Sequence, residues 1–128
     1  MKRLLLDTHT FLWWLADDTA LGDTCRELIG DGHNEVYVSA ATTWEISIKR
    51  RLGKLEAPPD IDGIVEDERF VGLPISLYHG NQAGQLPFIH RDPFDRMLIA
   101  QAQAEGLSIV TADPVIPEYG IATIPAKE

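Results

Sequence analysis

The sequence has few of the features that mark secreted, disulfide-bonded or membrane proteins. Its 128 residues include one cysteine, Cys25, which excludes an intrachain disulfide framework and a zinc cluster built on cysteines. No apolar segment is long enough to cross a bilayer. Asp7 interrupts the apolar start at 4–6 and no small-residue cleavage site follows, which argues against a signal peptide. We therefore expect a soluble, cytoplasmic protein with no membrane segment.

Positive charge is also scarce. Lys and Arg number 11 against 20 Asp and Glu, which gives a net charge of −9. Phosphate contacts rely on Lys and Arg, so this balance argues against a protein that simply coats nucleic acid. The negative net charge is still compatible with a nuclease. Acids that hold a metal ion count as negative in the sum, whereas the bound ion reverses the local field. The basic residues are grouped at 49–54 and 90–96, and the first group is equally compatible with a solvated helix face.

The length and the apolar pattern predict a single α/β domain over residues 1–128. A chain of this size buries roughly two thirds of the surface that its unfolded form exposes, enough for a core without crosslinks. Apolar runs alternate with segments of helical period, which is typical of a parallel sheet whose strands are joined by helices. The predicted strands are 3–6, 36–38, 70–75, 107–110 and 121–124.

The predicted helices are bounded by residues that favour helix ends. Asp92 is a favoured N-cap and Pro93 a favoured first residue, and Gly106 ends that helix. Ser39 caps another helix that continues to Pro58-Pro59. Four apolar residues of that helix recur at helical spacing and predict one buried stripe: Trp44, Ile48, Leu52 and Leu55. Further helices are predicted over 10–16, 18–30, 60–69 and 76–85.

Four acids occupy positions where such a sheet places its ligand site, which lies beyond the carboxyl ends of the strands. Asp7 directly follows the first strand, Asp113 follows the strand at 107–110, and Glu45 and Asp95 lie early in helices. Clustered acids repel one another and need a positive partner. The simplest is Mg²⁺ or Mn²⁺, hard cations that prefer oxygen ligands.

Each acid also has an ordinary structural explanation. A carboxylate at the helix start that follows Asp7 is favourable without any metal. Glu45 precedes Lys49 by four residues, the spacing of a surface ion pair. Asp113 precedes Pro114, as in an Asx turn.

The two acids of the Asp92-Pro93 helix differ in their predicted roles. Asp95 heads the apolar face formed with Leu98 and Ile99, which an exposed acid would not need, although the third position of a capped helix also favours an acid. Asp92 is predicted to be chiefly the helix cap.

Four blocks of the sequence, in this order, resemble PIN domains, and in particular VapC-like toxins of type II toxin–antitoxin pairs. The blocks are LLLDTH at 4–9, SAATTWEISIKRRLGKL at 39–55, HRDPFDRMLIAQA at 90–102 and VTAD at 110–113. The second and third are the specific ones. The resemblance covers nearly the whole chain and implies a three-layer α/β/α sandwich around a mostly parallel sheet.

The resemblance also implies a divalent-metal-dependent endoribonuclease that acts on RNA and is inhibited by a cognate antitoxin. The acids of the family correspond to Asp7, Glu45, Asp95 and Asp113, as catalytic and metal-binding residues, with Asp92 and Thr111 as auxiliary residues. Relatives often carry a basic or amide residue where this chain has Ala112. A substrate contact made there is either missing or supplied from elsewhere, for example by Arg96 or Arg91.

The expected chemistry follows from these ligands. Phosphodiester cleavage needs an activated oxygen nucleophile and relief of the phosphate charge, and one or two Mg²⁺ ions can supply both. Asp7 and Asp95 are the expected direct ligands, whereas Glu45 and Asp113 bind directly or through water.

Two other functions are compatible with the same acids. An aspartyl-phosphate phosphatase would use Asp7 as its nucleophile, but that chemistry normally wants a second acid where His9 stands. A non-enzymatic receiver or interaction module would use the acids to bind a regulatory metal.

An apolar run at 11–15 predicts a partner surface. On a helix this run is apolar all round, so one face packs on the sheet and the other would be exposed in a monomer. The alternative is full burial under the acidic segment 60–69. We expect a homodimer or an antitoxin contact that includes Trp13 or Trp14, beside the acidic site.

Overall fold

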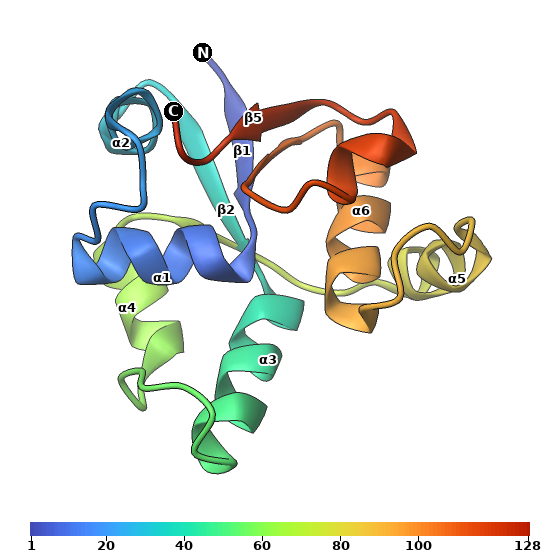
Figure 1. Ribbon diagram of the computed structural model, residues 1–128, viewed down its shortest axis with the longest axis horizontal. Helices are drawn as coiled ribbons and strands as arrows, with labels where there is room; N and C mark the ends of the chain where they lie inside the picture. The colour runs from blue at the N-terminus through green and yellow to red at the C-terminus, as the bar shows by residue number, and fades with distance from the viewer.

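The computed structural model describes residues 1–128 and contains one five-stranded sheet in the order β3-β2-β1-β4-β5 (Figure 1). The central strand β1, Arg3–Leu6, pairs with β2, Glu35–Ser39, and with β4, Ser108–Thr111. β3, Val71–Leu73, and β5, Thr123–Pro125, form the two edges. All four pairings are parallel, so every strand ends at the same edge of the sheet.

Helices cover both faces of the sheet, which gives the three layers that were predicted. They are α1, Thr8–Ala16; α2, Asp23–Gly30; α3, Ala40–Arg51; α4, Ile61–Asp67; α5, Leu77–Gln85; α6, Pro93–Glu105; and a 3₁₀ turn, Ile116–Tyr119. Successive side chains of a strand point to opposite faces. Accordingly Leu4 and Leu6 join the core cluster under α1, α2 and α4, whereas Leu5 joins the cluster under α5 and α6. No helix combines the length and apolar character that a membrane span requires.

The predicted face of α3 was wrong. Trp44 and Leu52 are each 61% exposed, and the buried residues of this helix are Ala41, Thr42, Glu45 and Ile46. The reason is visible in Figure 1, where α3 projects away from the sheet. The helix packs against α6, β2 and α1, and none of its last four residues, 48–51, is buried. The helix also ends at Arg51, before Gly53 with its φ of +71°, and does not continue to Pro58.

The other boundaries differ by a few residues. The second helix begins at Asp23 and not at 18, because Asp17 adopts a left-handed conformation that ends α1. The strand predicted over 70–75 is limited to Val71–Leu73, and the last strand is shifted to Thr123–Pro125.

The apolar run of α1 is partly covered. Trp14 Nε1 donates to Glu68 Oε2 at 3.1 Å, and the Trp14 ring lies 6.1 Å from the Phe70 ring. Trp13 and Trp14 are both half-buried. The residues at the end of α4 and just after it therefore cover part of this face, which falls short of the full burial that the alternative required. Large apolar side chains are more exposed elsewhere, for example at Leu77 and Phe88.

Candidate metal centre

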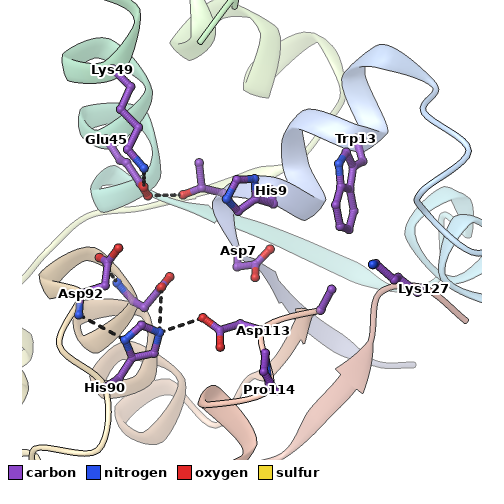
Figure 2. Close-up of a pocket in the computed structure, with 13 residues that line it drawn as sticks. Asp7, His9, Trp13, Glu45, Lys49, His90, Asp92, Asp113, Pro114 and Lys127 are labelled. Atoms are coloured by element: carbon purple, nitrogen blue, oxygen red, sulfur yellow. Dashed lines mark hydrogen bonds and ion pairs between the residues drawn. The ribbon is translucent and has the colours of Figure 1, made fainter. Parts of the chain in front are cut away.

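A cleft of about 510 Å³ lies at the carboxyl edge of the sheet, where the end of β1, α1, α3, the start of α6 and the loop after β4 meet. The four predicted acids all line it (Figure 2). They come from separate elements and from positions as far apart as 7 and 113, and the parallel sheet brings them together.

Asp7 is held at the floor of the cleft by two hydrogen bonds. Its Oδ1 accepts from Thr10 N at 2.9 Å, so it caps α1, and its Oδ2 accepts from Thr111 Oγ1 at 2.5 Å. The side chain is buried, and this burial raises the pKa of Asp7 against the opposing effect of the hydrogen bonds from Thr111 and Thr10. Asp7 therefore both caps α1 and lines the cleft.

Glu45 forms the ion pair predicted from its spacing, but not on the surface. Its Oε2 lies 2.6 Å from Lys49 Nζ and its Oε1 accepts from Thr8 Oγ1 at 2.6 Å. Glu45 is only 4% exposed. The hydrogen bond to Glu45 raises the pKa of Lys49, so this lysine stays charged and committed to its partner.

Asp95 is a second acid of the cleft whose pKa is raised. Its pKa is raised to about 7, first by burial and then by the charge of Asp92, with smaller contributions from Asp7 and Asp113 that oppose the effect of His90. The lining of the cleft contains five acids against two lysines and two histidines, so its negative charge exceeds its positive charge.

His90 connects two of the acids and was not predicted from the sequence. Its Nε2 lies 2.8 Å from Asp113 Oδ2 and 3.1 Å from Asp95 Oδ2, and its Nδ1 accepts from the Asp92 backbone N–H at 3.1 Å (Figure 2). Burial lowers the pKa of His90, but the hydrogen bond to Asp113 and the charges of the acids outweigh it, so the net pKa is raised.

The bond from Asp92 determines what the His90 ring can do. Since a backbone N–H can only donate, Nδ1 must offer a lone pair, and the neutral ring then carries its hydrogen on Nε2. The charged ring also carries a hydrogen on Nε2, but its Nδ1 is protonated too and can then no longer accept from the Asp92 N–H. In either form, Nε2 donates toward Asp113 and Asp95, so His90 orients these acids and does not offer Nε2 as a ligand.

Asp113 and the auxiliary residues Asp92 and Thr111 form local hydrogen bonds around the cleft. Asp92 Oδ1 accepts from Phe94 N and Asp95 N, at 2.8 and 3.2 Å, so it caps α6 as predicted. Asp113 Oδ1 accepts from Val115 N at 2.8 Å, the Asx turn expected before Pro114. Thr111 Oγ1 donates to Asp7 and accepts from Asp113 N at 2.9 Å, and so links the first acid to the last.

The expectation that Arg96 contacts the substrate is corrected by its position. It is buried outside the cleft, and its guanidinium donates to four backbone carbonyls: Ala83, Leu86, Pro87 and His90. Asp95 and Arg96 are consecutive, and consecutive helix positions point in different directions. Arg91 is exposed and does not line the cleft either. The cleft does contain a basic residue that the sequence gave no reason to choose, Lys127.

The residues of the cleft fit a hard divalent cation. Carboxylate oxygens of Asp95 and Asp113 lie within 4.8 Å of each other and of His90 Nε2, and Asp7 lies in the same cleft. The cleft offers more carboxylate oxygens than its basic residues balance, and a Mg²⁺ or Mn²⁺ ion would offset this excess of negative charge.

Comparison with known proteins gives consistent results. The PIN domain family matches residues 4–122. Ribonuclease VapC16 of Mycobacterium tuberculosis is 38% identical over 60 residues, which cover 45% of this chain and 43% of that protein. The matched part is thus under half the length of that relative.

Two solved structures illustrate the similarity of the fold. A chain of DNA-bound VapBC from Salmonella typhimurium is 22% identical, covers 97% of this chain and 98% of that chain, and has a TM-score of 0.69. A chain of a toxin–antitoxin complex from Klebsiella pneumoniae is 15% identical, covers 96% and 97%, and has a TM-score of 0.64. At these identities the likeness shows the fold alone.

Proposed function

This chain belongs to the PIN domain family, and from that premise we propose that it is a divalent-metal-dependent endoribonuclease and the toxin of a toxin–antitoxin pair. The observation that carries the proposal is the meeting of Asp7, Glu45, Asp95 and Asp113 in one cleft whose negative charge exceeds its positive charge. Such excess is costly to the fold and is typical of a functional site.

Asp7, Asp95 and Asp113 would hold Mg²⁺ or Mn²⁺, with Glu45 assisting through its free lone pairs. When bound, the ion lowers the pKa of water and offsets charge on the phosphate. The chain itself supplies the fixed geometry. Thr111 and Thr10 orient Asp7, His90 orients Asp95 and Asp113, and Lys49 and Thr8 fix Glu45.

The same contacts argue against the phosphatase alternative. Asp7 is 5% exposed and both of its oxygens accept hydrogen bonds, from Thr10 N and from Thr111 Oγ1. Each oxygen keeps a further lone pair that a metal ion can use, but the low exposure of Asp7 leaves little room for the approach of a phosphorus atom.

The toxin role is supported by the proteins that this chain resembles. The mycobacterial relative is named a ribonuclease, and the Klebsiella structure is a toxin–antitoxin complex. We therefore propose RNA as the substrate, a cognate antitoxin and a second copy of this chain as partners, and the cytoplasm as the location. Trp13 lines the cleft and is half-buried, so it remains the proposed antitoxin contact, whereas Trp14 is already bonded to Glu68.

The test is cleavage of single-stranded RNA by the purified chain with Mg²⁺, with Mn²⁺ and with EDTA. We expect cleavage only with a metal. Asp7→Asn should reduce the rate by at least about 100-fold, since the cleft loses an anionic ligand, and should abolish Mn²⁺ binding in calorimetry. The unfolding midpoint of the metal-free protein should hold or rise, because repulsion is relieved.

Asp67→Asn is the matched control, because it removes one charge at the exposed end of α4, away from the cleft. Cleavage that persists in EDTA, or an Asp7→Asn protein with full metal-dependent activity, would refute the proposed function.

A further inference from the structure

Two of the four basic side chains that line the acidic cleft are committed to an acid, and a third, His9, lies 6.3 Å from the Trp13 ring. Lys49 is paired with Glu45, and His90 lies between Asp95 and Asp113. Lys127 also lines the cleft, but it forms no ion pair and no side-chain hydrogen bond. Figure 2 shows its ammonium end directed toward the side of the cleft where Asp7 lies. This charge is available to something that enters the cleft.

The backbone that carries Lys127 is firmly held. The neighbouring Ala126 is fully buried; its N–H donates to Thr111 O at 2.9 Å, and its carbonyl accepts from Gly22 N at 2.9 Å. On the other side, Glu128 O accepts from Thr24 N at 2.8 Å. Lys127 is therefore tied on both sides to the body of the fold, and Thr111 is itself the residue that orients Asp7.

Gly22 makes this attachment possible. A Cβ at this position would lie 2.4 Å from Lys127 O and 2.2 Å from the carbonyl carbon of Glu128, distances that no side chain tolerates. The absence of a side chain at Gly22 allows the last residues of the sequence to approach α2 closely and places Lys127 over the cleft.

The neighbouring surface leaves room for a ligand group beside this lysine. Ala112 and Pro114, which share the cleft wall with Lys127, carry small or non-ionisable side chains. An RNA strand carries one negative charge for each nucleotide, so an acidic cleft must oppose its approach unless a free cation meets a phosphate.

We infer that Lys127 binds a phosphate oxygen of the RNA strand and positions that strand across the acidic cleft. The inference rests on the proposed function, since RNA is the substrate proposed there. A lysine ammonium suits the task because it is a compact charge with three donors on a flexible stem, and it can follow a phosphate without a fixed fork geometry.

The first experiment measures RNA binding without cleavage, by fluorescence anisotropy of a labelled single strand in the Asp7→Asn background. Adding Lys127→Ala should weaken binding about tenfold, and the slope of log affinity against log salt should decrease by about 0.7, the value for one phosphate contact on a single strand. Lys127→Arg should retain most of the affinity. Lys2→Ala removes the same charge just before the start of β1, at the end of the strands away from the cleft. It should change neither the RNA affinity nor the salt slope beyond about twofold.

The second experiment measures cleavage with Mn²⁺ by the otherwise unchanged chain. Lys127→Ala should raise KM about tenfold and leave kcat within about threefold, and its Mn²⁺ affinity in calorimetry should equal that of the unsubstituted chain. A merely structural role would lower the unfolding midpoint without this division between KM and kcat.

The two proposals fail separately. An unchanged affinity and salt slope in Lys127→Ala, or the same loss in Lys2→Ala, would overturn the inference and leave the nuclease intact. Absence of metal-dependent cleavage in the unsubstituted chain would refute the proposed function. The binding experiment would still decide whether Lys127 contacts RNA.

Discussion

A half-buried acid, Asp95, and a buried base, Arg96, are neighbours in the sequence of α6 and have opposite environments. Arg96 donates to four backbone carbonyls, and its guanidinium lies 4.8 Å from the centre of the Phe88 ring. Asp95 lies near three other acids and 3.1 Å from His90 Nε2, and burial together with the charges of these acids raises its pKa to about 7. The first charge is fully satisfied by the fold, and the second is not. A charge that the protein itself leaves unbalanced is the better indicator of a ligand site.

The largest expected effect is a loss of stability when Arg96, the charge that the fold satisfies, is removed. Arg96→Met should lower the free energy of unfolding by about 3–5 kcal/mol, because the carbonyls of Ala83, Leu86 and Pro87 lose their buried donors. Urea denaturation measures the loss. Arg91→Met, at an exposed position five residues earlier, should change it by less than about 0.5 kcal/mol. Equal effects would show that Arg96 does not hold the α5–α6 connection.

The next effect is a gain of stability when Asp95, the charge that the fold leaves unbalanced, is neutralised. The folded-state pKa of Asp95 lies above its ordinary value of 3.8, so the folded protein holds a proton that the unfolded chain releases. The stability of the metal-free protein should therefore fall as the pH rises from about 4 to about 7. Asp95→Asn should flatten this dependence and raise the free energy of unfolding at pH 8 by about 2 kcal/mol.

The check is urea denaturation in EDTA across this pH range, with Asp67→Asn as the control for loss of one negative charge. A pH dependence that persists in full in Asp95→Asn would assign the unbalanced charge to another residue.

A smaller effect, on Mn²⁺ affinity, is expected at His90, which lies between Asp95 and Asp113. Its Nε2–H is directed toward Asp95 and Asp113, so His90→Ala should leave these proposed ligands less well oriented and weaken Mn²⁺ binding about tenfold at pH 8. Calorimetry measures the change. His33→Ala, at a side chain that is 94% exposed, is the control. Tighter Mn²⁺ binding would instead mean that His90 acts as a competing positive charge.

The smallest effect, on the rate of RNA cleavage, is expected at Asp92, which caps α6 and also lines the cleft. Asp92→Ser should keep the rate of RNA cleavage within about threefold, because Ser caps a helix nearly as well as Asp. Asp95→Ser should lose at least about 100-fold, because a hydroxyl does not replace an anionic ligand. Equal losses in a matched cleavage assay would place Asp92 among the metal ligands.

The sequence predicted the parallel sheet and the positions of its acids because both depend on short local patterns. Leu4-Leu5-Leu6 before Asp7 predicts a buried strand with an acid at its end, and Asp92-Pro93 predicts a helix start. The face of α3 was predicted wrongly because periodicity shows where apolar residues recur, and not which neighbours are present to cover them. Trp44 fits the helical period and is nevertheless exposed, since α3 extends beyond the sheet.

His90 and Lys127 were missed for a different reason. No spacing relates His90 to Asp113, which lies 23 residues further on, or Lys127 to Asp7. Arg96 was proposed as a replacement for the substrate contact that Ala112 cannot make, although its direction on the helix takes it to the carbonyls before α6.

The sequence by itself therefore determined the α/β class, the edge of the sheet at which the acids gather, and the residue types that suit a hard cation, because local propensity and the parallel strand order fix these. Only the tertiary structure decided which charges are satisfied. Asp95 and Arg96 are adjacent in the chain, but burial, hydrogen-bond donors and neighbouring charges come from segments far away in the sequence. Charge balance is a property of three-dimensional proximity, and it separates the charge that stabilises this fold from the charges proposed to bind a metal.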